Sequence, residues 1–124
     1  MNVVDSSGWL EYFADGPNAG FFEKPIQDVG NLVVPTLSVF EVFKRIAQQR
    51  SEGDALQAVA AMQQGIVAEL TVPLALESAR LSLGEKIPMV DSIMLATARA
   101  HRATLWTQDA DLKNVEGVQF IAKK

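Results

Sequence analysis

Strand-like and helix-like segments alternate along nearly the whole chain, and this alternation limits the fold more than any other feature of the sequence. Short apolar runs bounded by turn residues have the length and composition of buried strands. Between them, apolar residues recur three and four positions apart, as on one face of a helix. Strands that alternate with helices predict an α/β fold, with a central parallel sheet of about five strands flanked by helices on both faces. The predicted strands are 3–5, 32–35, 67–71, 104–107 and 118–121, and the predicted helices are 7–14, 18–27, 37–49, 53–63, 73–83 and 88–101.

The length and composition favour a single domain spanning residues 1–124. The 124 residues are 48% hydrophobic, which suffices for one buried core, and no linker or repeat divides them. The absence of cysteine excludes disulfides and thiolate zinc sites and suits a reducing cytosol. Because no stretch approaches the roughly 20 apolar residues that span a bilayer, we expect a cytoplasmic protein with no membrane association.

Four carboxylates stand at junctions between apolar segments and the elements that follow: Asp5, Glu41, Asp91 and Asp109. In a parallel sheet, the carboxyl ends of the strands meet at the edge where such folds bind ligands. We therefore expect acids from several elements to gather in one crevice and to hold metal. Oxygen ligands without cysteine favour Mg²⁺, or Mn²⁺, over zinc.

Each aspartate also has a structural explanation. Asp5 and Asp109 stand where an Asp side chain caps a helix start, and Asp91 stands where a negative charge opposes the helix dipole. Asp91 differs from the others because Met94 and Leu95 follow it on the same helical face. A carboxylate that heads an apolar face needs a partner or a metal.

Glu41 is the acid whose sequence context favours a structural role. It completes the segment Ser38-Val39-Phe40-Glu41, which matches a capping box, and it could pair with Arg45 one turn later. On a helical wheel it lies roughly opposite the apolar stripe of its helix.

The predicted helices 37–49 and 53–63 are joined by a short connection and should form an antiparallel hairpin. Their apolar stripes fit either the core or an interface with a second copy or a partner protein. The stripe residues are Val39, Val42, Phe43 and Ile46 in the first helix and Ala55, Leu56, Val59 and Met62 in the second.

In order and spacing, the acidic segments resemble the PIN-domain nucleases, and most closely the VapC-type toxins of toxin–antitoxin pairs. The resemblance covers nearly the whole chain. It rests on VVDSS at 3–7, LSVFEV at 37–42, VDSIMLATA at 90–98 and LWTQDADL at 105–112.

This resemblance implies a Mg²⁺-dependent endoribonuclease whose acidic quartet is Asp5, Glu41, Asp91 and Asp109. It also implies a small antitoxin partner, a homodimer, and an RNA substrate cleaved at a phosphodiester bond. Asp111 matches a position that more often supports the turn than the metal. The hydroxyls of Thr107 and of Ser6 or Ser7 match positions that support the ligands, and Leu112 replaces the phenylalanine usual in the family.

The net charge of −4 argues against a broadly basic nucleic-acid binder, although the four acids alone account for that charge. A local basic patch is still possible from Lys44, Arg45, Arg50, Arg80, Lys86, Arg99 and Arg102. Two other classes remain open: a non-catalytic α/β binding module, and a phosphoacceptor or phosphatase-like domain that uses Asp5. The phosphatase pattern calls for a second aspartate where Ser7 stands. The single histidine, His101, excludes a histidine acid–base pair.

Overall fold

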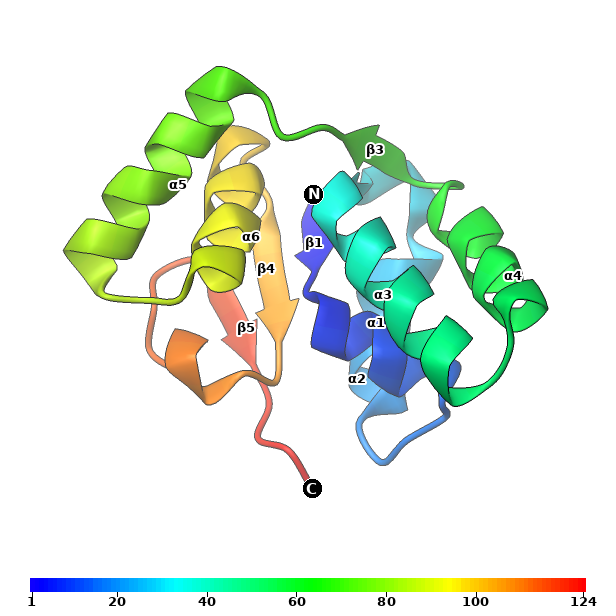
Figure 1. Ribbon diagram of the computed structural model, residues 1–124. Coiled ribbons are helices and arrows are strands. Elements are labelled where there is room, and N and C mark those ends of the chain that lie inside the picture. The colour runs from blue at the N-terminus through cyan, green and yellow to red at the C-terminus, as the bar shows by residue number, and fades with distance from the viewer.

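The computed structural model describes residues 1–124 and contains one five-stranded sheet in which every strand pair is parallel (Figure 1). The predicted α/β fold, with a parallel sheet between helices, is confirmed. The strands are β1 (Asn2–Val4), β2 (Leu32–Pro35), β3 (Ile66–Ala68), β4 (Thr104–Thr107) and β5 (Val118–Phe120). The helices are α1 (Ser6–Phe13), α2 (Ala19–Gln27), α3 (Thr36–Gln49), α4 (Glu52–Met62), α5 (Val72–Glu85) and α6 (Met89–Ala100), with short 3-10 helices η1 (Val29–Asn31) and η2 (Ala110–Leu112).

The strand order β3-β2-β1-β4-β5 places a change of direction at the centre of the sheet. The chain moves outward from β1 to β2 and β3, then returns to place β4 on the other side of β1. The carboxyl ends of β1 and β4 therefore diverge into different helices. In sheets of this kind, the crevice at such a switch point is where ligands bind.

Side chains alternate across the sheet and divide the interior into two apolar clusters. Val4 and Val34 belong to one cluster, together with side chains of α1, α2, α3 and α4. Val3 and Val33 belong to the other, which α6 and η2 complete. Because successive strand residues point to opposite faces, the Val-Val pairs of β1 and β2 bury one side chain on each face.

Helix α6 is buried along most of its length. All residues from Asp91 to Ala98 are buried, because the helix packs against the sheet on one side and against α5 on the other (Figure 1). Its first turn is therefore held at the carboxyl edge of the sheet. None of the helices in the structure is both long enough and apolar enough to cross a membrane.

Strand β3 ends at Ala68, before the end of the predicted strand 67–71, and the last predicted strand residue instead caps helix α5. Thr71 caps α5 by accepting a hydrogen bond from the backbone N–H of Leu74 at 3.4 Å. Pro73 then occupies the first turn of the helix, where its missing N–H has no cost. The other predicted elements differ from the observed ones by at most two residues at either end.

The predicted hairpin of α3 and α4 is present, and the two helices pack against each other. Val42, Ile46, Ala55 and Met62 lie in the core, as one interpretation of the stripes required. Leu56, however, is 56% exposed, so the stripe of α4 is not wholly a core stripe.

Helix α1 approaches the sheet closely because Gly8 has no side chain. A Cβ atom at this position would lie 2.5 Å from Cε1 of Phe22 and 2.8 Å from Cγ1 of Val4. We expect Gly8→Ala to lower the free energy of unfolding by about 1–3 kcal/mol through overpacking. Urea unfolding measures this, and Gly20→Ala is the matched control because a Cβ atom there meets nothing within 4 Å. Equal stability of the Gly8→Ala variant and the wild type would contradict the expected overpacking.

Candidate metal centre

Asp5 follows β1 directly and is 4% exposed. Its Oδ1 accepts a hydrogen bond from the backbone N–H of Ser6 at 2.8 Å, so it caps α1 as the sequence allowed. Its Oδ2 accepts a hydrogen bond of 2.8 Å from the hydroxyl of Thr107. Both oxygens are thus held by donors from different parts of the chain, which fixes the direction of the carboxylate.

Thr107 ends β4, is fully buried, and connects Asp5 to Asp109. Its hydroxyl oxygen accepts a hydrogen bond of 3.0 Å from the backbone N–H of Asp109 while the hydroxyl donates to Asp5. Asp109 in turn accepts a hydrogen bond from the N–H of Asp111 at 2.9 Å and caps η2. The predicted short helix after β4 is therefore present, and Asp111 contributes its backbone N–H to the cap.

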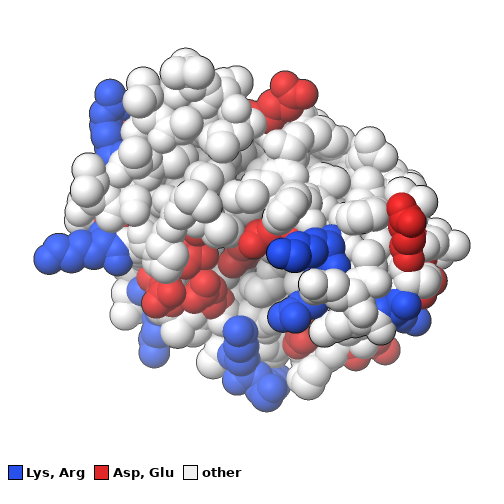
Figure 2. Space-filling view, in the orientation of Figure 1, with Lys and Arg blue, Asp and Glu red and all other residues white.

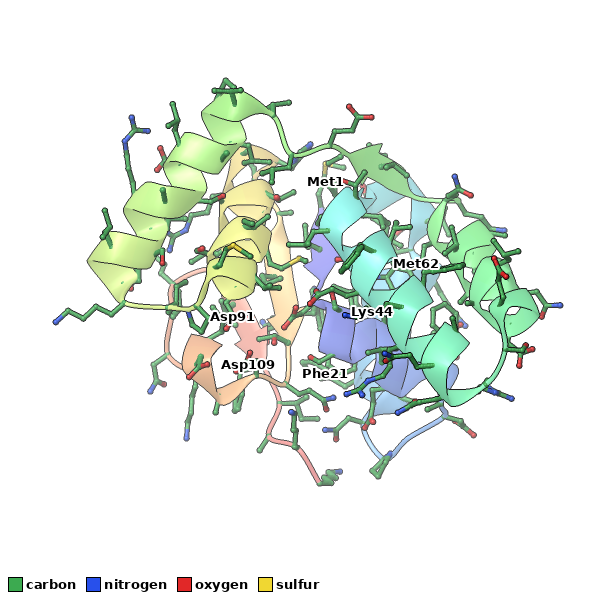
Figure 3. The ribbon with its side chains drawn as sticks, in the orientation of Figure 1. Met1, Phe21, Lys44, Met62, Asp91 and Asp109 are labelled. Atoms are coloured by element: carbon green, nitrogen blue, oxygen red, sulfur yellow. The ribbon has the colours of Figure 1, made fainter.

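Asp91 lies in the first turn of α6 and is 4% exposed. The side chains of Asp5, Asp91 and Asp109 each place one carboxylate oxygen within 4.8 Å of the others, and we call these three residues the carboxylate cluster. Figure 3 shows the labelled Asp91 and Asp109 facing the same region below α6. A set of three carboxylates at this spacing has the composition and size of a site for a divalent cation.

Glu41 lies beside the carboxylate cluster and not within it. Its Oε1 accepts a hydrogen bond of 2.6 Å from the hydroxyl of Ser6, the residue after Asp5. The capping-box prediction was wrong: α3 starts after Pro35, and the Ser38 hydroxyl donates to Sδ of Met94 at 3.4 Å. The predicted pair with Arg45 is also absent, since neither of the two ion pairs in the chain involves Glu41. Local spacing allowed both contacts, but the tertiary partner of Glu41 is Ser6.

No cationic side chain neutralises the carboxylate cluster. Of the two ion pairs, Arg50–Asp54 joins the residue after α3 to the first turn of α4, and Arg80–Glu77 lies within α5. Burial raises the pKa of Asp91 to about 8, and repulsion from Asp109 and Asp5 adds to the effect. Burial also raises the pKa of Asp5, although the hydrogen bonds from Thr107 and the Ser6 N–H oppose this.

These raised pKa values predict that the metal-free protein loses stability as pH increases. Between about pH 4, where an unfolded aspartate releases its proton, and about pH 8, the folded chain keeps a proton on Asp91 that the unfolded chain has lost. In EDTA, the midpoint of thermal unfolding should therefore be lower at pH 8 than at pH 5.5. Asp91→Asn should reduce this difference, and an equal difference in both proteins would contradict the role of Asp91.

Two buried polar residues near the cluster were not singled out from the sequence. The Nδ2 group of Asn18 donates to Oε1 of Gln108 at 2.9 Å and to the carbonyl oxygen of Ala122 at 3.0 Å. Gln108 lies between Thr107 and Asp109, so these contacts hold the acidic segment 105–112 against the loop before α2. The position of Gln108 inside the motif was the available signal. By contrast, the Oγ of Ser7, one of the predicted supporting hydroxyls, is buried without a partner.

Comparison with known proteins identifies the fold. The family model described as PIN domain matches residues 3–118. No curated protein matches the sequence significantly. A solved toxin–antitoxin complex from Klebsiella pneumoniae contains a chain with 20% identity and a TM-score of 0.81, and the match covers 96% of each chain.

Two further solved structures have the same fold. The Mycobacterium tuberculosis toxin VapC20, described as cleaving the sarcin-ricin loop, is 15% identical with a TM-score of 0.78, over 95% of this chain and 97% of that one. VapBC2 from Rickettsia felis, solved with a DNA fragment from its promoter, is 10% identical with a TM-score of 0.74, over 98% and 97%. The family match spans most of the sequence, and these structures share its fold. This chain therefore belongs to the PIN-domain family.

Proposed function

We propose that this protein is a Mg²⁺-dependent endoribonuclease. The observation that carries the proposal is the carboxylate cluster: three acids from three separate segments meet at the switch point of a PIN domain, and no cationic side chain pairs with them. Three hard oxygen ligands, two from buried side chains and one from a half-buried side chain, fit Mg²⁺, and Mn²⁺ has the same preference. The pKa of Asp91, raised mainly by burial and further by repulsion from Asp109 and Asp5, supports this proposal, because a bound cation would stabilise the charged carboxylate.

In this proposal Asp5, Asp91 and Asp109 hold the metal. A divalent ion held by carboxylates supplies charge neutralisation at the phosphate and a nucleophile near neutral pH. Thr107 keeps Asp5 and Asp109 in place through its two hydrogen bonds. Glu41, tied to Ser6, adds a fourth negative charge beside the cluster and orients water or holds a second ion.

We further propose that the protein is the toxin of a VapBC-type pair, acting in the cytoplasm as a homodimer and inhibited by a small antitoxin. Structures of this fold include the Klebsiella pneumoniae toxin–antitoxin complex and VapBC2 of Rickettsia felis. Exposed apolar side chains offer contact area for such partners: Leu56 on α4, Val72 and Leu83 on α5 and Met89 on α6.

Cleavage of purified RNA tests the proposed function. We expect the protein to cut single-stranded RNA in Mg²⁺, to stop in EDTA, and to resume when Mg²⁺ is restored in excess. A phosphatase would instead hydrolyse small phosphoesters such as p-nitrophenyl phosphate. A binding module would act on neither substrate and would not be stabilised by Mg²⁺ against thermal unfolding. Either of those results would replace the proposed function.

A further inference from the structure

A small pocket lies on the exposed face of α3 beside Glu41, and the proposed catalytic residues do not account for it. It has a volume of about 250 Å³ and is lined by Phe40, Glu41, Lys44, Arg45 and Gln48. We call it the α3 pocket. Glu41 forms part of its wall and also accepts a hydrogen bond from the hydroxyl of Ser6, the residue after Asp5. The α3 pocket therefore adjoins the carboxylate cluster through a single side chain.

The lining combines an exposed aromatic ring with two unpaired cations. Phe40 is 62% exposed, and Nζ of Lys44 lies 5.8 Å from the centre of its ring. Neither Lys44 nor Arg45 forms an ion pair with any carboxylate. In Figure 2, basic side chains lie next to acidic ones in the middle of this face, and Figure 3 labels Lys44 on α3 facing the viewer. Aromatic rings beside cations are the usual surface for single-stranded nucleic acid.

We propose that the α3 pocket binds the nucleotide next to the cleaved phosphate in single-stranded RNA. This rests on the proposed ribonuclease function and names where its substrate lies. The base stacks on Phe40, Lys44 and Arg45 contact the phosphates, and the amide of Gln48 reaches the base edge. A chain of net charge −4 with an acidic cluster repels a polyanion, so local cations beside that cluster are needed to hold one.

An adjacent apolar groove distinguishes this proposal from protein binding. The groove runs between α3 and α4 and shares Phe40, Lys44 and Gln48 with the α3 pocket. Leu56 lines only the groove, whereas Arg45 lines only the α3 pocket. The groove is mostly apolar and suits a protein surface, while the pocket has the charge that suits phosphate. Substitutions at Arg45 and Leu56 therefore report on the two surfaces separately.

Binding of a fluorescein-labelled single-stranded RNA of mixed sequence, followed by anisotropy at several salt concentrations, tests the cations. Asp5→Asn serves as the parent so that the probe is not cut. Lys44→Ala/Arg45→Ala should weaken binding about ten-fold. The salt slope, which is the steepness with which the logarithm of the binding constant falls with the logarithm of salt concentration, should decrease by about 1.4, since each phosphate contact on a single strand contributes about 0.7. The matched control is Arg80→Ala/Arg99→Ala, which removes two charges from α5 and from the end of α6 opposite Asp91.

Equal losses in both double variants, or no loss in either, would overturn the inference while leaving the proposed function intact. Wild-type protein that neither binds nor cuts RNA would overturn the proposed function itself, and the inference with it. The two failures are therefore distinguishable.

The aromatic contribution is tested in the same assay. Phe40→Ala should weaken binding about five-fold or more without changing the salt slope, and Phe40→Tyr should restore it because a tyrosine ring also stacks. Leu56→Ser should leave RNA affinity unchanged. If Leu56→Ser weakens RNA binding as much as Phe40→Ala, the strand lies in the apolar groove. If Phe40→Ala leaves RNA binding unchanged, the base does not stack on this ring; either result contradicts the proposal.

Discussion

Asp5→Asn should leave the chain folded and reduce its cleavage of RNA to background. Asparagine has the shape of aspartate, and its carbonyl oxygen can still accept from the Ser6 N–H. The substitution removes one of the three carboxylates of the cluster, and with it one negative charge that would face a bound cation. Without that charge the two remaining carboxylates bind a divalent cation poorly, and the activity that depends on the cation is lost.

Stability measurements separate this effect from unfolding. Burial raises the pKa of Asp5, so the charged side chain is disfavoured in the metal-free fold and a neutral amide relieves that cost. The thermal midpoint of Asp5→Asn in EDTA should therefore be no lower than that of the wild type. Asp15→Asn is the matched control: Asp15 is exposed, has a φ of 51°, and asparagine tolerates that conformation. Ribonuclease activity retained by Asp5→Asn would sink the assignment of Asp5 as a ligand.

Thr107→Val should weaken the affinity for Mg²⁺ by about 10- to 100-fold while preserving the shape of the buried site. Valine fills the same volume but has no hydroxyl. Oδ2 of Asp5 therefore loses its hydrogen-bond donor, and the N–H of Asp109 loses its acceptor. Both cluster residues then lose the contact that directs them. The Mg²⁺ concentration for half-maximal cleavage should rise accordingly.

Thr107→Ser is the control for that experiment, because it keeps the hydroxyl and removes only a methyl group. We expect it to require nearly the same Mg²⁺ concentration as the wild type. If the valine and serine variants behave alike, the hydroxyl of Thr107 has no part in metal binding, and the two hydrogen bonds serve the fold alone.

Features that depend on local sequence were predictable. The Val-rich runs of β1 and β2 indicated buried strands because a central parallel strand is covered on both faces. The caps at Asp5 and Asp109 followed from the preference of aspartate for helix starts. Asp91 was expected to be withdrawn from water because Met94 and Leu95 share its face, and it is buried.

Features that depend on partners distant in sequence were not predictable. Glu41 matched a local capping pattern, yet its carboxylate accepts a hydrogen bond from the hydroxyl of Ser6. This contact depends on the packing of α1 against α3, which the local pattern does not describe. The hydrogen bonds of Asn18 to Gln108 and Ala122 likewise join segments that share no sequence pattern. Propensities describe neighbours along the chain, and side-chain geometry between elements lies outside them.

The pairing of β1 with β4 has a consequence for the order of events during synthesis. Val3 pairs with Leu105, so the central pair of the sheet cannot form until most of the chain has left the ribosome. Asp109 follows β4 in the sequence, so Asp5 does not meet Asp109 before that point. A chain that ends before β4 therefore carries Asp5 and Asp91 without Asp109, and such a product should be inert toward RNA.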